Sequence, residues 1–311
     1  LVGQRARDDH QVRLPRREAH DLRAAVLFRL TRNLDIEIDE DAEDLFSEIQ
    51  SFIKKRRRGR PVRLEIEPGC DGRLRTFLFD TLKVDESIVY ESEGPLDLSA
   101  FKKLYNADAF AGLRQPALLP VPAADFPEGE DLFACIRRRD RMVFHPYESF
   151  DSVVAFIRTA AEDDRVLAIK QTLYRVSGDS GIIEALMRAA DRGKQVTVLV
   201  ELKARFDEEN NIQWAQRLEE AGCHVIYGLA NLKIHCKIAL VIRREEEGIR
   251  RYIHLGTGNY NDTTARLYTD IGLFTAREGF GVDASSLFNS LTGYTRPPVY
   301  NRLVAAPDDC R

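Results

Sequence analysis

Hydrophobic and polar residues follow two different patterns along the chain, which predict two domains. Over residues 26–121, runs with a period of two and runs with helical spacing succeed one another without a repeated strand–helix–strand unit. This order predicts an α+β domain. Within it we expect strands at 27–32 and 62–66, and helices at 42–53, 74–82 and 96–107. Residues 1–25 are rich in arginine and show no clear period, so we expect an atypical start there.

Prolines cluster between residues 114 and 131 and mark a boundary, after which strands and helices alternate. We expect strands at 166–169, 196–200, 225–227, 235–242, 252–255 and 271–274, and helices around 153–160, 181–192 and 211–221. The alternation predicts an α/β fold over residues 122–303, with a mixed, mostly parallel sheet and helices on both faces. The last strands lack intervening helices, so we expect them to add antiparallel partners. Residues 304–311 are expected to be a truncated tail.

Composition narrows the classes of protein that the chain can belong to. Its 311 residues and 44% hydrophobic content suffice for two domains, each with its own core. A formal net charge of −4 argues against a protein that coats nucleic acid or a membrane surface. No apolar run is long enough for a transmembrane segment, and residues 1–10 contain no apolar stretch typical of a signal peptide. The five cysteines are scattered, which indicates reduced thiols and a cytoplasmic protein.

The segment of residues 231–242 carries the most chemistry. His235 and Lys237 are two residues apart at the start of an apolar run, so a strand would point both side chains to one face. Cys236, between them, is expected to face the core. An imidazole can act as a nucleophile, and a lysine can hold a phosphate as a point charge. A His-x-Lys pattern alone is weak, however, because most histidines near strands have packing or surface roles.

Other segments strengthen the signal when they are taken together with this one. They are Lys-Gln-Thr-Leu-Tyr-Arg at 170–175, Glu-Leu-Lys-Ala-Arg-Phe-Asp at 201–207, His-Leu-Gly-Thr-Gly-Asn-Tyr-Asn at 254–261 and Thr-Ala-Arg-Leu-Tyr-Thr-Asp at 264–270. With the His-x-Lys pair, they resemble polyphosphate kinases of the histidine-phosphorylating type, which are relatives of the phospholipase D superfamily. The resemblance extends from about residue 28 to about residue 303. It implies a head-like domain at 26–121 and a phospholipase D-like catalytic half-domain at 122–303.

The resemblance also implies an activity, a set of ligands and an assembly. The activity is reversible transfer of the terminal phosphate of ATP to inorganic polyphosphate through a phosphohistidine. His235 matches the phosphorylated histidine, and Lys237 would stabilise the transferring group. The implied ligands are ATP or ADP, polyphosphate and Mg²⁺, and the complete protein is expected to form a homo-oligomer. We expect no nucleic-acid partner.

Two arginines are the leading candidates for contacts to phosphate. Arg175 lies just past the first expected strand of the α/β region, and Arg205 lies just past the second. Ligands of such sheets gather beyond the carboxyl ends of the strands, and guanidinium groups match phosphate oxygens in pairs. Surface ion pairs are the alternative for each arginine taken alone. The family places Mg²⁺ near these two arginines. Because a guanidinium has no acceptor for a cation, we expect both to bind the phosphates of the Mg-nucleotide.

Three further candidates follow the strand expected at 252–255. Asn259 lies in a Gly-Thr-Gly-Asn loop, where it could bond a phosphate oxygen or orient the imidazole. An ordinary turn would explain the same sequence. Tyr268 matches the family tyrosine that contacts the nucleotide, and its alternative is a half-buried strand residue. Asp270 follows on the same segment.

The sequence also departs from the family pattern, which leaves other functions open. Phospholipase D-like sites use two histidine motifs, whereas this chain has one His-x-Lys pair. We therefore expect this polypeptide to synthesise little or no polyphosphate alone, a point that labelled ATP would test. One alternative function is a phospholipase D-like phosphodiesterase or nuclease. Those enzymes usually carry an aspartate shortly after the lysine, and residues 238–242 are all apolar. The second alternative is a non-enzymatic fragment that binds phosphate or mediates oligomerisation.

Overall fold

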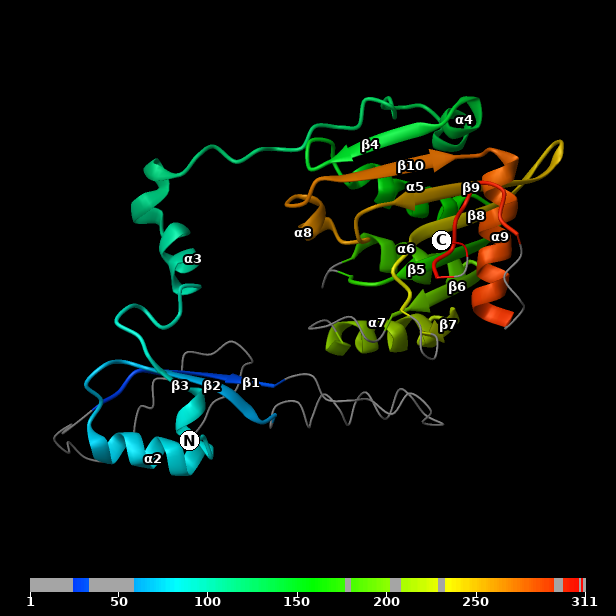
Figure 1. The fold of residues 1–311 in the computed structure, drawn as a ribbon. Helices are drawn as coiled ribbons and strands as arrows, with labels where there is room; N and C mark the ends of the chain where they lie inside the picture. The colour runs from blue at the N-terminus through cyan, green and yellow to red at the C-terminus, as the bar shows by residue number, and fades with distance from the viewer. Residues whose placement is uncertain are drawn as a thin grey trace. The chain divides into compact units, whose positions relative to one another are not determined.

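The computed structural model describes residues 25–33, 59–176, 180–201, 208–228, 233–293, 299–307 and 309. These residues fall into two compact units, one up to residue 117 and the other from residue 118 (Figure 1). Each unit is described by itself. Within the described residues, no helix combines the length and the apolar character needed to cross a membrane.

The smaller unit is a three-stranded sheet with one helix packed against it. Its strands are β1 (Phe28–Arg32), β2 (Pro61–Ile66) and β3 (Val89–Glu91), and its helices are α2 (Gly72–Leu82), α3 (Ala100–Tyr105) and the 3₁₀ turns η1 (Glu86–Ile88) and η2 (Asp108–Leu113). β1 pairs with β2 antiparallel, and β2 pairs with β3 parallel. The core contains Phe28, Leu64, Ile66, Leu78 and Val84. This α+β arrangement agrees with the expectation, except that the helix expected at 96–107 is shorter. The helix expected at 42–53 lies outside the described residues.

The larger unit contains a seven-stranded sheet. Its strands are β4 (Arg141–His145), β5 (Val166–Leu173), β6 (Gln195–Val200), β7 (His224–Tyr227), β8 (Lys237–Glu245), β9 (Gly248–Gly256) and β10 (Asp270–Thr275). Their order is β4-β10-β9-β8-β5-β6-β7. The neighbours β5–β6 and β6–β7 are parallel, and the other four neighbouring pairs are antiparallel. The mixed sheet is therefore confirmed, but parallel ladders are the minority. β8 and β10 alone run against the other strands of the sheet; β8 connects to its neighbour β9 by a tight turn, and β9 connects to its neighbour β10 through residues 257–269.

Helices cover both faces of this sheet, as expected (Figure 1). They are α4 (Leu132–Arg138), α5 (Asp151–Glu162), α6 (Gly181–Asp191), α7 (Glu208–Glu220), α8 (Asp262–Ala265) and α9 (Glu278–Gly293). α5 and α6 pack together and contact β5 and β6, whereas α9 contacts β8 and β9. On the side of α9 the core contains Leu199, Ile238, Leu240, Ile253 and Phe288. Burial of this apolar surface is the main favourable contribution to the stability of the unit.

β8 is the central element of the sheet. Residues 238–241 are at most 1% exposed, so both faces of the strand are buried as its apolar run predicts. Strand pairing begins at Lys237, two residues later than expected. His235 therefore lies just before the strand. Cys236 is exposed, and the expectation that it would face the core was wrong, because residue 236 precedes the first paired position.

The edge strand β4 has an inverted pattern of burial. Arg141, Val143 and His145 face inward, whereas Met142 and Phe144 are exposed. Phe144 pairs directly with Ile271 of β10, which is also exposed. The outer side of β4 and β10 is thus a strip of apolar side chains.

Candidate active site

The candidate active site lies at one edge of the seven-stranded sheet, where strands of opposite direction bring distant residues together. β5 ends at Leu173 and is followed by Tyr174 and Arg175. Its antiparallel neighbour β8 begins at that same edge with Lys237. Asp270 begins β10 at this edge as well. Open α/β sheets bind their ligands at such an edge, beyond the carboxyl ends of the parallel strands.

Two buried side chains fix the backbone on either side of His235. The hydroxyl of Thr172 donates a hydrogen bond to the carbonyl oxygen of Cys236 at 2.8 Å and accepts one from the N–H of Ile238 at 3.1 Å. The carboxylate of Glu201, which is 1% exposed, accepts a hydrogen bond from the N–H of Ile234 at 2.8 Å. Because buried hydrogen bonds of this kind are costly to leave unmade, the two anchors hold the approach to β8 in one conformation.

Asn211 of α7 connects these anchors to the end of β5. Its side-chain amide donates hydrogen bonds to the carbonyl oxygen of Tyr174 at 2.7 Å and to the carbonyl oxygen of Glu201 at 2.8 Å. Asn211 is 1% exposed, so both bonds are shielded from water. One buried amide therefore ties the residues that follow β5 to the residue that follows β6.

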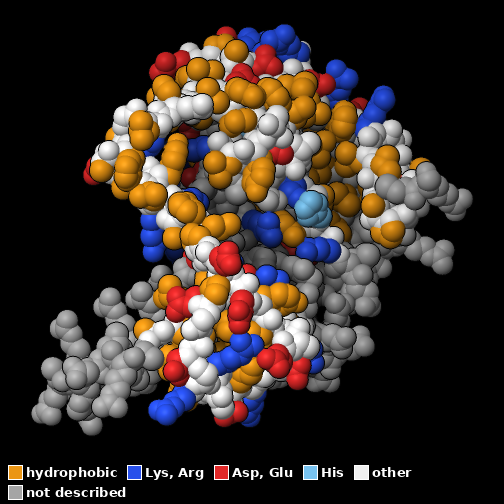
Figure 2. All heavy atoms as spheres, turned by 60° about the vertical axis from the view of Figure 1, so that its left-hand side comes forward, with side chains coloured by type: hydrophobic (Ala, Val, Ile, Leu, Met, Phe, Trp, Pro, Cys, Tyr) orange, Lys and Arg blue, Asp and Glu red, His pale blue; other side chains and the backbone are white. Residues whose placement is uncertain are grey.

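The ring of Tyr174 is the common contact of the cationic groups at this edge. Its centroid lies 4.9 Å from the centroid of the His235 imidazole, with the two planes at 80°. The Nζ atoms of Lys237 and Lys233 lie 5.0 Å and 5.3 Å from the same centroid, and the guanidinium carbon of Arg175 lies 5.4 Å away. His235 and Arg175, which are distant in sequence, therefore both lie against one aromatic ring. Figure 2 shows a histidine among lysine and arginine side chains on one face of the molecule.

Lys237 has a partly desolvated ammonium group. The residue is 6% exposed, and its Nζ donates a hydrogen bond to the carbonyl oxygen of His235. Burial is the main cause that lowers the pKa of Lys237, the nearby charge of Arg175 lowers it further, and the charge of Asp270 opposes both. Among the described residues, Lys237 has no carboxylate within ion-pair distance. Its positive charge is consequently available to an anionic ligand.

The electrostatic surroundings of His235 favour a neutral imidazole. Desolvation by the neighbouring protein lowers its pKa below the ordinary value of 6.5, and the positive charges of Lys237, Lys233 and Arg175 lower it further. A neutral ring retains the lone pair that a nucleophile needs. The same cations that lower this pKa would attract the phosphate that the ring could attack. The arrangement can therefore perform nucleophilic chemistry on an anion near neutral pH.

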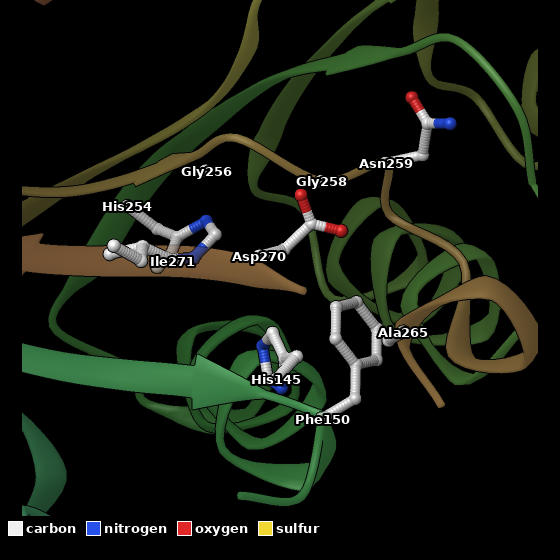
Figure 3. Close-up of a pocket in the computed structure, with 10 residues that line it drawn as sticks. His145, Phe150, His254, Gly256, Gly258, Asn259, Ala265, Asp270 and Ile271 are labelled. Atoms are coloured by element: carbon white, nitrogen blue, oxygen red, sulfur yellow. The ribbon is translucent and has the colours of Figure 1, made fainter. Parts of the chain in front are cut away.

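A small cavity of about 10 Å³ lies beside this cluster (Figure 3). Its lining includes His145, His254, Gly258 and Asp270. Asp270 is held by a hydrogen bond from the hydroxyl of Thr257 at 2.9 Å, and its carboxylate lies against Gly258. A Cβ atom at residue 258 would lie 2.4 Å from Oδ2 of Asp270, so only glycine fits there. The glycine of this loop thus serves the placement of Asp270.

The two histidines of the cavity are buried. Nδ1 of His254 lies 2.9 Å from the hydroxyl of Tyr260, and Nδ1 of His145 lies 2.8 Å from the carbonyl oxygen of Glu148. Burial lowers the pKa of His254 to about 3, so this ring is neutral in the folded protein near pH 7. The ring of His254 therefore adds no positive charge to the cavity near pH 7.

The structure brings together some of the residues that the sequence singled out. His235, Lys237 and Arg175 lie around Tyr174, and Asp270 is close enough to Lys237 to affect its pKa. Asn259 lines the cavity, and its side chain points away from Asp270 in Figure 3. Tyr268 is 63% exposed in the turn before β10. Arg205 lies outside the described residues, so its place relative to His235 stays a prediction.

Sequence reasoning missed four residues that shape the site: Tyr174, Thr172, Glu201 and Asn211. Tyr174 and Thr172 lie within the segment at 170–175, and Glu201 begins the segment at 201–207, where the charged arginines carry the stronger chemical signal. A polar residue in an apolar strand, such as Thr172, is the available signal, because a buried hydroxyl needs a partner. Asn211 belongs to none of these sequence motifs, and its role is evident only from its contacts in the folded chain.

Comparisons with known proteins agree with these motifs. Residues 131–297 match the family model described as polyphosphate kinase C-terminal domain 1, and residues 18–104 match the polyphosphate kinase middle domain. A polyphosphate kinase from Halalkalibacterium halodurans is 54% identical over 288 residues, which cover 91% of this chain and 41% of that protein. The chain belongs to the polyphosphate kinase family. A polyphosphate kinase from Streptomyces coelicolor is 51% identical over 291 residues, covering 91% of this chain and 39% of that protein.

A solved polyphosphate kinase structure confirms the fold of the family member described here. The structure from Porphyromonas gingivalis superposes with a TM-score of 0.70 at 29% identity, covering 90% of this chain and 40% of that one. The chain thus spans about 40% of the length of these relatives. The family membership is established, whereas the activity of the complete relatives comes to this chain only as a proposal.

Proposed function

We propose that this chain provides the phosphohistidine half of a polyphosphate kinase, which transfers the terminal phosphate of ATP reversibly to inorganic polyphosphate. The observation that supports this most is the position of His235 beside Lys237 and Arg175, around the ring of Tyr174. An imidazole kept neutral among cations is suited to attack a phosphorus atom. Membership of the polyphosphate kinase family supplies the substrate class.

The chemistry can be written with balanced electrons in two steps. The lone pair of the neutral His235 ring forms a bond to the γ-phosphorus of ATP, and the bond between that phosphorus and its bridging oxygen breaks. ADP leaves with the electron pair of that bond. A terminal oxygen of polyphosphate then attacks the phosphohistidine, the N–P bond breaks, and the ring regains its lone pair. Lys237 and Arg175 would bind the phosphate oxygens in both steps, where charge is the main need of phosphoryl transfer.

The described residues contain no dedicated binding site for Mg²⁺. No group of three or more histidine, cysteine, aspartate or glutamate side chains in this part of the chain could hold a metal ion. The guanidinium of Arg175 has no acceptor atom and cannot be a ligand. We therefore propose that Mg²⁺ belongs to the phosphates of the nucleotide, in the vicinity of Arg175 and Arg205.

The remaining candidates have proposed roles in binding. Tyr268 is exposed and offers a ring face for adenine, and Asn259 offers an amide N–H for a phosphate oxygen. Asp270 is proposed to take part in binding Mg-ATP, and its charge acts on Lys237. Arg205 would supply a second guanidinium fork. Each of these roles is proposed from residue chemistry and from the family motifs.

The wider setting is proposed as well. We propose a head-like domain at 26–121, a catalytic half-domain at 122–303, a cytoplasmic location and a homo-oligomer in the complete protein. The four cysteines that the structure describes are unpaired, which fits a reducing compartment. The proposed partners are ATP or ADP and polyphosphate, with no nucleic acid.

The proposal is tested by labelling the histidine. The chain is incubated with Mg²⁺ and ATP labelled in its γ-phosphate, and protein-bound label that is stable in base but labile in acid is measured. We expect label on the unaltered chain and on His224→Gln, and none on His235→Gln. His224 is an exposed histidine at the start of β7, so it is a matched control for the same substitution. Equal label on His235→Gln would refute the phosphohistidine, and an unlabelled chain would refute its formation by this half alone.

A second measurement separates the kinase from a phosphodiesterase. The chain is incubated with a chromogenic phosphate diester under the same conditions. Residues 238–242 of β8 are apolar and buried or nearly so, and they provide no carboxylate after Lys237. We expect no diester cleavage above background. Cleavage that disappears in His235→Gln would favour the phosphodiesterase instead.

A further inference from the structure

Tyr174 differs from the residues already assigned to the site because its ring contacts three of them, His235, Lys237 and Arg175, and carries no charge. It is 8% exposed and follows β5 directly. Its carbonyl oxygen is held by the buried amide of Asn211, so the ring is anchored through its own backbone. The ring therefore has a fixed position from which it can order more mobile side chains.

The contacts of the ring are favourable and selective for cations. Aromatic rings attract cations within about 6 Å of the centroid, by roughly 0.5–2 kcal/mol each depending on exposure. The ammonium groups of Lys237 and Lys233 both satisfy this condition, at 5.0 Å and 5.3 Å. The His235 ring meets Tyr174 nearly at right angles, which is a preferred geometry for two aromatic rings. A single side chain thus touches the nucleophile and both lysines.

A carboxylate could also hold the lysine side chains in place, but it would change the charge that they offer to a phosphate. A carboxylate in contact with an ammonium cancels its charge and competes with a bound phosphate. Among the described residues, neither Lys233 nor Lys237 lies within ion-pair distance of a carboxylate. The nearby Glu201 is directed instead to the N–H of Ile234. An aromatic ring orients the ammonium groups and leaves their net charge intact.

We infer that Tyr174 is a positioning residue, whose ring holds the imidazole of His235 and the ammonium groups of Lys233 and Lys237 in one arrangement for an incoming phosphate chain. The inference rests on the proposed function for its substrate class. It assigns Lys233 to the same anion-binding cluster, although that residue is exposed. It requires the π face of residue 174 and not its hydroxyl group.

The test compares two replacements of Tyr174: phenylalanine, which keeps the aromatic ring, and leucine, which removes it. Binding of inorganic tripolyphosphate to the chain is measured by calorimetry for Tyr174→Phe and Tyr174→Leu. We expect Tyr174→Phe to bind like the unaltered chain, and Tyr174→Leu to bind roughly tenfold more weakly, since two or three cation–π contacts are lost. Equal affinity of the two variants would overturn the inference.

A second series remains informative even if Tyr174→Leu does not fold. Phenylalanines with one, two and three ring fluorines at position 174 keep the shape of the ring and progressively weaken its negative face. We expect tripolyphosphate affinity to fall with each fluorine. An affinity that is independent of fluorination would show that residue 174 acts only through packing.

The third measurement does not depend on phosphate transfer at all. The pKa of His235 is followed by NMR, with its resonance identified by its loss in His235→Gln. Lys233, Lys237 and Arg175 are the charges that act on this ring, and desolvation adds to their effect. Tyr174→Leu should raise the pKa of His235, because the imidazole becomes less shielded from water and the neighbouring cations are no longer held close to it. Tyr174→Phe should leave this pKa unchanged. If the chain binds no tripolyphosphate, the proposed function fails while this titration still decides the role of Tyr174.

Discussion

The hydroxyl of Thr172 on β5 accepts a hydrogen bond from the backbone N–H of Ile238 on β8, at 3.1 Å. The same hydroxyl donates to the carbonyl oxygen of Cys236 at 2.8 Å. Lys237 is therefore enclosed between two backbone groups that a single side chain holds. The position of the lysine depends on an uncharged residue of the neighbouring strand.

Replacing Thr172 by valine should destabilise the chain and loosen the site. Valine has the same shape but no hydroxyl, so the N–H of Ile238 and the carbonyl of Cys236 lose their partner. We expect the free energy of unfolding to fall by about 1–3 kcal/mol, which is the usual cost of buried groups left without a hydrogen bond. Urea denaturation measures this change. Thr172→Ser keeps the hydroxyl and should retain most of the stability; equal losses in both variants would contradict the role of the hydrogen bonds.

Replacing Asn211 by aspartate should produce a stability that depends on pH. The amide of Asn211 donates to two carbonyl oxygens, and an ionised carboxylate of the same size would be repelled by both. Folding would thus raise the pKa of the new carboxyl group. A raised pKa means that the variant is closest to the unaltered chain at low pH and loses stability as pH rises through that pKa. Urea midpoints measured at several pH values test this, with Asn211→Ala as a control that lacks the carboxyl group.

The buried imidazole of His254 should make the unaltered chain sensitive to mild acid. Burial lowers its pKa from 6.5 to about 3, so below pH 6.5 the unfolded chain binds a proton that the folded chain does not. Stability contributed by the neutral ring is present above pH 6.5 and is lost as pH falls toward 3, by roughly 1 kcal/mol per pH unit. His254→Phe should show a shallower decrease over this range. Parallel pH profiles of the two proteins would show that His254 is not buried as a neutral ring.

Adding one methyl group at Gly258 should disturb the cavity. The new Cβ atom would lie 2.4 Å from Oδ2 and 2.5 Å from Cγ of Asp270, so the carboxylate would have to move. We expect Gly258→Ala to lower the free energy of unfolding by about 1–3 kcal/mol. The matched control is Gly293→Ala, where a Cβ atom meets nothing within 4 Å at the end of α9. That variant should be unchanged or slightly more stable, as is usual for alanine in a helix.

Local periodicity accounts for much of the fold. The strand at β6 was expected to within one residue, and the helix at α6 ends one residue earlier than expected. Both have regular apolar spacing, and α6 has a serine at position 180 whose hydroxyl caps the helix through the N–H of Ile183. β8 was expected because its apolar run has no polar face. Apolar spacing and helix caps depend on residues that are close together in the chain, so they can be recognised in the sequence.

β4 was not expected as a strand, and its burial explains the failure. Pattern analysis looks for apolar residues that face inward, but here Arg141 and His145 are buried while Met142 and Phe144 are exposed. The inward polar groups find partners in the folded chain: the guanidinium of Arg141 donates to the carbonyl oxygen of Cys135, and Nδ1 of His145 lies beside the carbonyl oxygen of Glu148. A sequence pattern cannot reveal such partners before the fold is known.

The candidate site was predictable only in part, for a similar reason. His235 and Lys237 were found because they are neighbours in one strand, and Arg175 because it follows the end of another. Their meeting around Tyr174 depends on the antiparallel register of β5 and β8, in which Gln171 is opposite Ala239. That register arises from the whole sheet and not from either segment alone. The anchors Glu201 and Asn211 depend on the same long-range geometry.

The apolar strip on β4 and β10 has a practical consequence for anyone who handles this chain. Met142 and Phe144 of the edge strand β4, together with Ile271 of the neighbouring β10, are exposed apolar side chains that another apolar surface could cover. Sulfate salts strengthen the association of apolar surfaces, so turbidity should develop in ammonium sulfate sooner than charge alone would suggest. Purification in chloride at low concentration, or a lysine in place of Phe144, should keep the polypeptide dispersed.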